Sequence, residues 1–239
     1  LTIQYDGTDF HGWQVQAEGR TVQGDIEAAL KQIFPTEKIN LLGAGRTDSG
    51  VHALAQVAHV ELPDRLSPME LCSALNGNLQ WDVRINSAIE AKEDFHSRFS
   101  AIDREYEYHL VEDYSPITRH YTVKLKWDID SSLLNDCANK LLGEHDFSSF
   151  CKANAEVEHK KCIIYQAAWQ FTEKKYIFQI RANRFLQHMV RYLVGTMLEV
   201  ARGRYEVSDF RALVYGHETD VVVTRAPARG LFLKKVNYQ

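Results

Sequence analysis

The chain has 239 residues, of which 45% are hydrophobic and 25% charged, a balance typical of a globular protein with its own core. No run of about 18 apolar residues occurs, so no membrane span is predicted, and the formal net charge of −4 argues against nonspecific binding of polyanions. The charge is uneven, because residues 152–239 carry 15 Lys and Arg against 8 Asp and Glu, whereas residues 1–151 carry 13 against 24. The basic part can face an anionic partner, or neutralise the acidic part across an internal interface.

The four cysteines, at positions 72, 137, 151 and 162, show neither CxxC spacing nor the density of a disulfide framework. The first residues, LTIQYDG, resemble neither a signal peptide nor a transit peptide. They lack a Met and begin with strand-like alternation, so a few native residues are expected to precede them. We therefore expect a reduced, cytoplasmic protein.

The first part of the chain predicts a strand at 1–5 and a helix from Thr21 to Phe34, in which apolar residues recur at helical spacing. Strands at INLLGAGR and ALAQVAHVEL are expected on either side of a glycine-rich stretch. A short helix, LSPMELCSAL, and a strand, VRINSAIEA, follow.

After FHSRFSA the pattern begins again. REYEYHLV and YTVKLKW alternate with period two and predict strands, and IIYQAAWQF and KKYIFQIRA predict a pair joined by TEKK. Helices are expected after a cap at Ser131 or Ser132, from Asn183 to about Arg202, and after a cap at Ser208, with LFLKKV as a last strand. Two α+β halves are therefore predicted, residues 1–100 and the more basic residues 101–239.

The stretch GAGRTDSGVHA, residues 43–53, is either a plain turn or a site. Arg46 and Asp48 stand two positions apart, so on extended backbone they project to the same side. His52 adds a further polar group within four residues. These features favour a site.

In RANRFLQHMVRYLVG, residues 181–195, helical geometry would place Arg184, His188 and Arg191 in one stripe. Arg191 stands among apolar neighbours, and a buried guanidinium needs an anionic partner. The partner is either an ordinary carboxylate in a structural ion pair, or an active-site carboxylate or phosphate.

REYEYHLV places Tyr106 and Tyr108 on one face of a strand. Alternate aromatic residues on a strand are most often core residues. A tyrosine beside a cleft can instead stack on a base or act as an acid or base.

Several chemistries have no support in the sequence. The histidines and cysteines lack zinc-binding spacings, and there is no GxxxxGK[ST], GxGxxG or GxSxG motif. The remaining chemistry rests on a carboxylate, a tyrosine and arginines.

GAGRTDSGVHA closely resembles the catalytic-aspartate motif of the TruA-type tRNA pseudouridine synthases. YDGTDFHGWQVQ, FHSRFSA with REYEY, LLGEHDFSSFCK, ANRFLQHMVRYLVG and RAPARGLFL resemble further blocks of that family, in order, from residue 3 to about 233. Ser49 stands where alanine is commoner and Tyr192 where asparagine is frequent, and neither change removes a reactive group.

The resemblance implies that Asp48 is the essential carboxylate and that Arg46 contacts RNA or holds a flipped nucleotide. It makes Tyr106 the tyrosine that packs on the target base and Arg191 the arginine that pairs with Asp48. His52, Arg184 and His188 are further candidates for RNA contact. The glycines of the motif would let RNA backbone come close.

The resemblance also implies the fold and the reaction. The fold would be α+β, with two RRM-like halves forming one mixed, mainly antiparallel sheet and helices on the outer faces. The enzyme would be an isomerase that converts uridine to pseudouridine at positions 38, 39 and 40 of the tRNA anticodon stem-loop, as a homodimer, without metal or other cofactor. Because a base inside a helix is unreachable, the target nucleotide must be flipped. Asp48 attacks C1′ or starts a glycal route, and both routes stay open.

Three alternatives compete with this reading. A noncatalytic tRNA-binding or RNA-folding module would not need Asp48, Tyr106 and Arg191 together. A glycosidase or nucleoside hydrolase would normally need two carboxylates beside the scissile bond. A structural protein with a plain turn at residues 43–53 would not be expected to carry the ordered series of motifs.

Overall fold

The structure is a computed structural model that describes residues 1–152, 159–217 and 219–239. The chain forms two compact units, unit 1 with Leu1–Ile102 and Phe232–Gln239, and unit 2 with Asp103–Leu231. The sequence analysis assigned all of residues 101–239 to the second half. The structure places the last eight residues in unit 1, because β10 (Leu231–Asn237) pairs with a strand of that unit.

Unit 1 is built on a mixed, mainly antiparallel sheet. β1 (Thr2–Tyr5) is antiparallel to both β3 (His52–His59) and β4 (Val83–Ser87), and β2 (Leu42–Gly43) is antiparallel to β3. β10 runs parallel to β3, with Phe232 opposite His52. Residues 44–51, which include Arg46 and Asp48, therefore connect β2 to β3.

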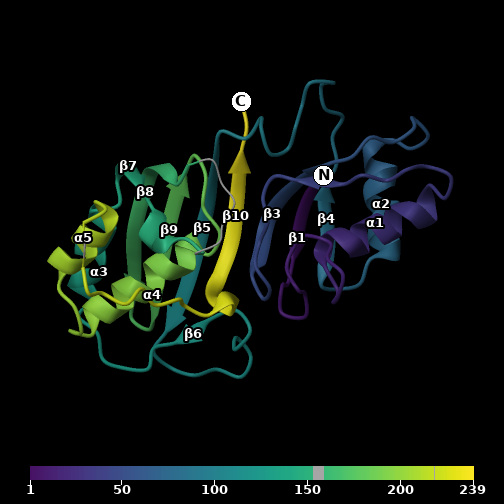
Figure 1. Cartoon of the computed structure of the whole chain (residues 1–239). Helices are drawn as coiled ribbons and strands as arrows, with labels where there is room; N and C mark the ends of the chain where they lie inside the picture. The colour runs from purple at the N-terminus through teal and green to yellow at the C-terminus, as the bar shows by residue number, and fades with distance from the viewer. Residues whose placement is uncertain (153–158, 218) are drawn as a thin grey trace. The chain divides into compact units, whose positions relative to one another are not determined.

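The two helices of unit 1 begin where side chains satisfy their first N–H groups. α1 (Val22–Ile33) is capped by Thr21, and α2 (Pro68–Asn78) has a capping box between Ser67 and Glu70. The predicted helical spacing in α1 is confirmed, because its apolar stripe is buried. The two helices lie side by side in Figure 1.

Unit 2 contains a four-stranded antiparallel sheet in the order β5-β9-β8-β7, formed by Asp103–Val111, Lys175–Ala182, Lys161–Thr172 and Gly143–Asp146. The predicted pairing across TEKK is confirmed, with Thr172 opposite Lys175. α3 (Ser131–Asn139), α4 (Met189–Ala201) and α5 (Val207–Val214) pack together, and α3 also packs on β8 (Figure 1). Short 3-10 helices cover Ser148–Phe150 and Ala228–Gly230. The expected α+β fold class is confirmed.

Three local predictions in unit 2 were wrong. β6 is only Val123–Lys124, because β5, its parallel partner, ends at Val111. Asp130 caps α3 through its side chain and Glu206 is the cap of α5, in place of the predicted serines. A carboxylate at this position also interacts favourably with the positive end of the helix dipole.

No helix in the described ranges is long and apolar enough to cross a membrane. All four cysteines are free thiols, and burial raises the pKa of both Cys137 and Cys162 to about 12. These two thiols are therefore packing groups of unit 2, as expected of unreactive buried cysteines.

Candidate active site

The loop between β2 and β3 presents Asp48 from an irregular backbone. Arg46 is exposed, Thr47 is buried and Asp48 is half-buried. This alternation is expected when residues i and i+2 project to one side, and it agrees with the prediction that Arg46 and Asp48 share a side. The loop directs its two charged residues away from the core of unit 1.

Main-chain contacts from residues 5–13 hold this loop in place. Trp13 N–H donates to Thr47 O at 3.1 Å, and Phe10 O accepts from Gly50 N–H at 3.3 Å and from the Ser49 hydroxyl at 3.1 Å. The Tyr5 hydroxyl and Thr47 Oγ1 are 2.8 Å apart and share a buried hydrogen bond. Asp48 is therefore bracketed by anchored neighbours, which is the preorganisation that a catalytic group requires.

Arg20 contacts Phe10, in the segment that anchors the loop of Asp48. The sequence analysis gave Arg20 no role. Its guanidinium lies 4.2 Å from the centre of the Phe10 ring and pairs with Asp25 and Asp82 at 2.5 Å each. Asp82 follows Trp81 in a distant part of the sequence, so no local signal identifies this cluster. Arg20 links the loop that contacts Thr47 and Gly50 to α1 and to the start of β4.

The glycines of the motif have different uses. A side chain at Gly43 would lie 2.6 Å from the Trp13 ring, and Gly50 has a φ of 75°, so both are explained by the protein's own structure. A side chain at Gly45 would meet no atom within 4 Å. Of the three, Gly45 is the position whose missing side chain leaves space for another molecule.

His52 is part of the internal support of unit 1. It is only 1% exposed, and its Nδ1 accepts from Gly7 N–H at 3.0 Å and lies 3.1 Å from Asp6 Oδ1. Its ring stacks on Phe232, with centroids 4.7 Å apart. The burial makes His52 a group that holds the N-terminal loop rather than one that faces RNA.

Tyr106 lies on β5 of unit 2 and is half-buried, whereas Tyr108, two residues on, is fully buried. The Tyr106 and Phe185 rings form a T-shaped pair with a centroid distance of 5.0 Å and an interplanar angle of 82°. Phe185 had no assigned role in the sequence, although it lies inside the ANRF block. The two rings form an aromatic wall that remains partly open to solvent.

Arg191 lies in the first turn of α4 and is 9% exposed. Its Nε donates to Ala226 O at 2.8 Å, and Ala226 N–H donates to Arg191 O at 3.0 Å. These reciprocal bonds fix both the backbone and the orientation of the guanidinium. The predicted burial of Arg191 among apolar residues is confirmed.

Arg184 and His188 do not form a helical stripe with Arg191, and that prediction was wrong. α4 begins at Met189, and His188 is its cap with a φ of 67°. The preceding segment is used for tertiary contacts, because Asn183 exchanges hydrogen bonds with Ile163 and its carbonyl accepts from Arg104. The helical spacing of apolar residues in the sequence carries no information about such long-range hydrogen bonds.

Among the residues that the structure describes, no group of three or more His, Cys, Asp and Glu side chains could hold a metal ion. The polar groups that the motifs bring forward are therefore one carboxylate, arginines and a tyrosine.

Comparisons with known proteins identify the family of this chain. A family model described as tRNA pseudouridine synthase matches residues 1–100 and 137–239. The chain is 39% identical over 243 residues to tRNA pseudouridine synthase A of Latilactobacillus sakei, covering 100% of this chain and 98% of that protein. It is 41% identical over 237 residues to the enzyme of that name from Chlorobium limicola, covering 99% and 97%.

This chain belongs to the tRNA pseudouridine synthase family. The predictions of a pseudouridine synthase, of an isomerase and of a tRNA substrate are thereby confirmed. Within this family the loop between β2 and β3, which carries Asp48, is the candidate active-site loop.

Proposed function

We propose that this enzyme isomerises uridines 38, 39 and 40 in the anticodon arm of tRNA, with Asp48 as the catalytic group. The observation that carries the proposal is the position of Asp48, half-buried in a loop whose neighbours Thr47, Ser49 and Gly50 are all hydrogen-bonded to residues 5–13. A carboxylate held in this way can meet a flipped nucleotide without first ordering its own backbone.

The reaction breaks the N1–C1′ bond, rotates the uracil and forms a C5–C1′ bond. The proton on C5 is then lost and N1 gains a proton, so the overall change is an isomerisation. Asp48 either attacks C1′ or removes a proton from the sugar to start a glycal route. Neither route needs an oxidant, a metal or a nucleoside triphosphate.

The other site residues have roles that match their surroundings. Tyr106 stacks on the uracil, supported by its T-shaped contact with Phe185, and its hydroxyl takes part in removing the C5 proton. Arg46, exposed beside Asp48, contacts the RNA backbone. Arg191 is proposed as the partner of the catalytic carboxylate on the family resemblance, and its fixed guanidinium orientation supports that role.

We also propose that the enzyme works as a homodimer in the cytoplasm. The support for both statements is the family resemblance together with four free cysteines, which suit a reducing compartment. Sedimentation of the purified protein, with and without tRNA, measures the assembly directly.

The catalytic proposal is tested with tRNA carrying tritium at uracil C5. The wild type is expected to release tritium, whereas Asp48→Asn is expected to bind tRNA but release at least about 10³-fold less, because the amide is neither a nucleophile nor a base. Asp64→Asn, the same change at an exposed loop position, is the matched control and should behave as the wild type. Near-normal release by Asp48→Asn would remove Asp48 from the chemistry.

Positional selectivity is tested with tRNA transcripts that keep a single uridine at position 38, 39 or 40. Release from each of the three supports the proposed range. Release only from a uridine outside the anticodon arm would contradict it.

A further inference from the structure

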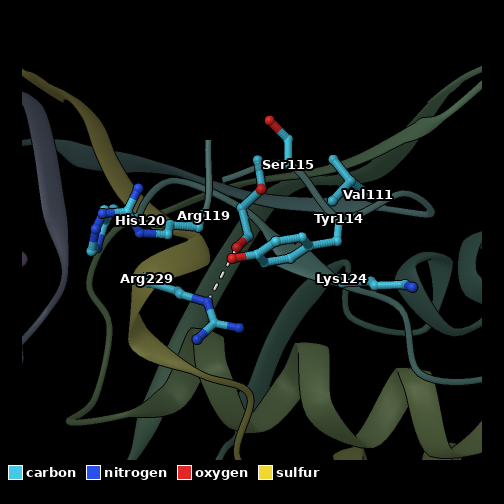
Figure 2. A pocket seen from close by; sticks show the side chains of 8 residues that line it. Val111, Tyr114, Ser115, Arg119, His120, Lys124 and Arg229 are labelled. Atoms are coloured by element: carbon cyan, nitrogen blue, oxygen red, sulfur yellow. Dashed lines mark hydrogen bonds between the residues drawn. The ribbon is translucent and has the colours of Figure 1, made fainter. Parts of the chain in front are cut away.

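Unit 2 contains a pocket of about 220 Å³ beyond the end of β5. It is lined by Val111, Tyr114, Ser115, Arg119, His120, Thr122, Lys124 and Arg229 (Figure 2). We call this set of residues the basic pocket. None of the site residues discussed above belongs to it.

The charge of the basic pocket is strongly one-sided. Its lining includes three permanent cations and a histidine, and none of its eight residues is a carboxylate. Unit 2 as a whole has 18 Lys and Arg against 18 Asp and Glu, so this concentration is local and not a consequence of the unit's composition. A cavity with three cations and no carboxylate in its lining favours entry of an anion.

The nearest acidic residues along the chain face other groups. Glu112 accepts a hydrogen bond from the Tyr176 hydroxyl at 2.5 Å, and Asp113 pairs with Lys174 at 2.9 Å. The hydrogen bond and charge of Lys174, with a smaller contribution from the charge of Lys124, hold the pKa of Asp113 below its usual value. These carboxylates are therefore occupied by residues at the turn of the β8–β9 hairpin instead of lining the pocket.

Arg229 is held in a defined position. Its Nε donates to Thr122 O at 3.2 Å, the bond drawn dashed in Figure 2. The backbone around it is fixed on β5, because the Tyr108 hydroxyl donates to Pro227 O at 2.8 Å and a side chain at Gly230 would lie 2.8 Å from the Tyr108 ring. A guanidinium placed by such contacts suits recognition of a phosphate, which it can bind through two N–H groups.

An aromatic ring completes the pocket. Tyr114 is 64% exposed although it lines the cavity, and Figure 2 shows its ring above the Arg229 side chain. A cationic groove with an exposed aromatic side chain is the arrangement by which proteins bind single-stranded nucleic acid, with bases stacked on the ring and phosphates beside the cations. A free phosphate has no base to stack on the ring, so the ring favours a nucleotide as the ligand.

We propose that the basic pocket binds a backbone phosphate of the tRNA, with an adjoining base stacked on Tyr114. This inference rests on the proposed function. Val111, at the edge of the pocket, is five residues beyond Tyr106 on the same strand, a distance on the order of 17 Å at the rise of a β-strand. The phosphate would therefore belong to a nucleotide other than the target, and the pocket would set the register of the RNA.

The pocket is also tied to the segment that orients Arg191. Ala226, whose carbonyl accepts from Arg191 Nε, is three residues from Arg229. Ala226 and Arg229 therefore belong to one short segment that is anchored by hydrogen bonds at Ala226, Pro227 and Arg229. This connection lies entirely within unit 2.

The test measures tRNA binding as a function of salt concentration for the double variant Arg119→Gln and Lys124→Gln. Both side chains are exposed, so the fold should be preserved, and a circular dichroism melt checks this. We expect about tenfold weaker binding at fixed salt and a slope of log K against log salt that is smaller by about one. Release of tritium at subsaturating tRNA should fall by the same factor as the affinity.

Lys126→Gln is the matched control, since Lys126 is an exposed lysine two residues from Lys124 that does not line the pocket. Tyr114→Ala should weaken binding about tenfold with an unchanged salt slope, because stacking carries no charge. A double variant that binds like Lys126→Gln would overturn the proposal. Saturable binding of inorganic phosphate at micromolar concentration would also overturn it, in favour of a free phosphate ligand.

Failure of the proposed function has a different signature. If the wild type releases no tritium but the double variant still loses salt slope, the pocket assignment stands and the catalytic proposal fails. If the wild type releases tritium and the slope is unchanged, the catalytic proposal stands and the pocket assignment fails.

Discussion

The two units hold their functional segments by different means. In unit 1 the loop that carries Asp48 is fixed mainly through main-chain atoms, as in the bonds from Trp13 N–H to Thr47 O and from Gly50 N–H to Phe10 O. In unit 2 residues 224–230 are fixed mainly by side chains that donate to main-chain carbonyls. The donors are Arg191 Nε, the Tyr108 hydroxyl and Arg229 Nε.

The difference shows what each region can tolerate. A loop fixed through its backbone leaves its side chains available for chemistry. It requires, however, that two segments of the main chain approach each other very closely. A segment fixed through side chains depends instead on a few polar atoms, each worth about 1 kcal/mol. Both regions nevertheless contain one glycine at a point of closest approach, Gly7 beside Val51 and Gly195 beside Thr224.

The largest effects are expected at these two glycines. A Cβ would lie 2.0 Å from Val51 O in Gly7→Ala and 2.1 Å from Thr224 O in Gly195→Ala, and backbone cannot rotate away as a side chain can. Each variant should lose about 3 kcal/mol in the free energy of unfolding. Urea unfolding measures the loss.

Gly77→Ala is the matched control for both. Gly77 lies in α2, has no positive φ, and a Cβ there would meet no atom within 4 Å. Alanine should therefore raise stability by about 0.5–1 kcal/mol. Similar losses in all three variants would show that the close approaches are not what makes Gly7 and Gly195 necessary.

A medium effect is expected at two buried tyrosines, and it separates the units. Tyr5→Phe removes the bond to Thr47 Oγ1, and Tyr108→Phe removes the bond to Pro227 O, each at a cost of about 1 kcal/mol in stability. Burial raises the pKa of Tyr108, so its hydroxyl stays a protonated donor. Denaturant midpoints should fall similarly in both variants.

Their functional effects should differ. Tyr5→Phe loosens the residue beside Asp48 and is expected to lower the rate of tritium release at saturating tRNA. Tyr108→Phe loosens the segment that carries Arg229 and is expected to weaken tRNA binding. Equal changes in rate and binding for both variants would contradict a division of labour between these two regions.

The smallest effect is expected at Ser49→Ala. Its hydroxyl donates to Phe10 O at 3.1 Å, but Ser49 is exposed and Gly50 N–H donates to the same carbonyl. Stability should fall by no more than about 0.5 kcal/mol, with turnover unchanged. A large loss of turnover would mean that main-chain bonds alone do not hold the loop that carries Asp48.

Much of this arrangement is predictable from local pattern. The spacing of Val22, Ile26 and Leu30 predicts α1, and the alternation in residues 104–111 predicts β5 with Tyr106 and Tyr108 on one face. Helical and strand periodicities are visible in any short stretch of sequence, so these elements could be predicted without knowledge of the fold. The assignment of Asp48, in contrast, depended on a motif and its resemblance to a family.

The errors arose where distant residues compete for the same backbone. The predicted helix from Asn183 begins only at Met189, because Asn183 bonds to Ile163 and Arg104. His52 lies in a polar, glycine-rich stretch of sequence that is typical of a surface loop. In the structure its ring stacks on Phe232 and its Nδ1 accepts a hydrogen bond from Gly7 N–H. Arg20 was overlooked because one of its two carboxylate partners, Asp82, is 62 residues away.

The sequence by itself determined the family, the α+β class, the identity of the candidate carboxylate and most of the helices and strands. Only the tertiary structure decided where α4 starts, that β10 joins unit 1, that His52 is buried, and that Arg119, Lys124 and Arg229 line one pocket. The physical reason is range. Periodicity and capping act over a few residues, whereas burial, ion pairing and the convergence of like charges depend on residues brought together from distant parts of the chain.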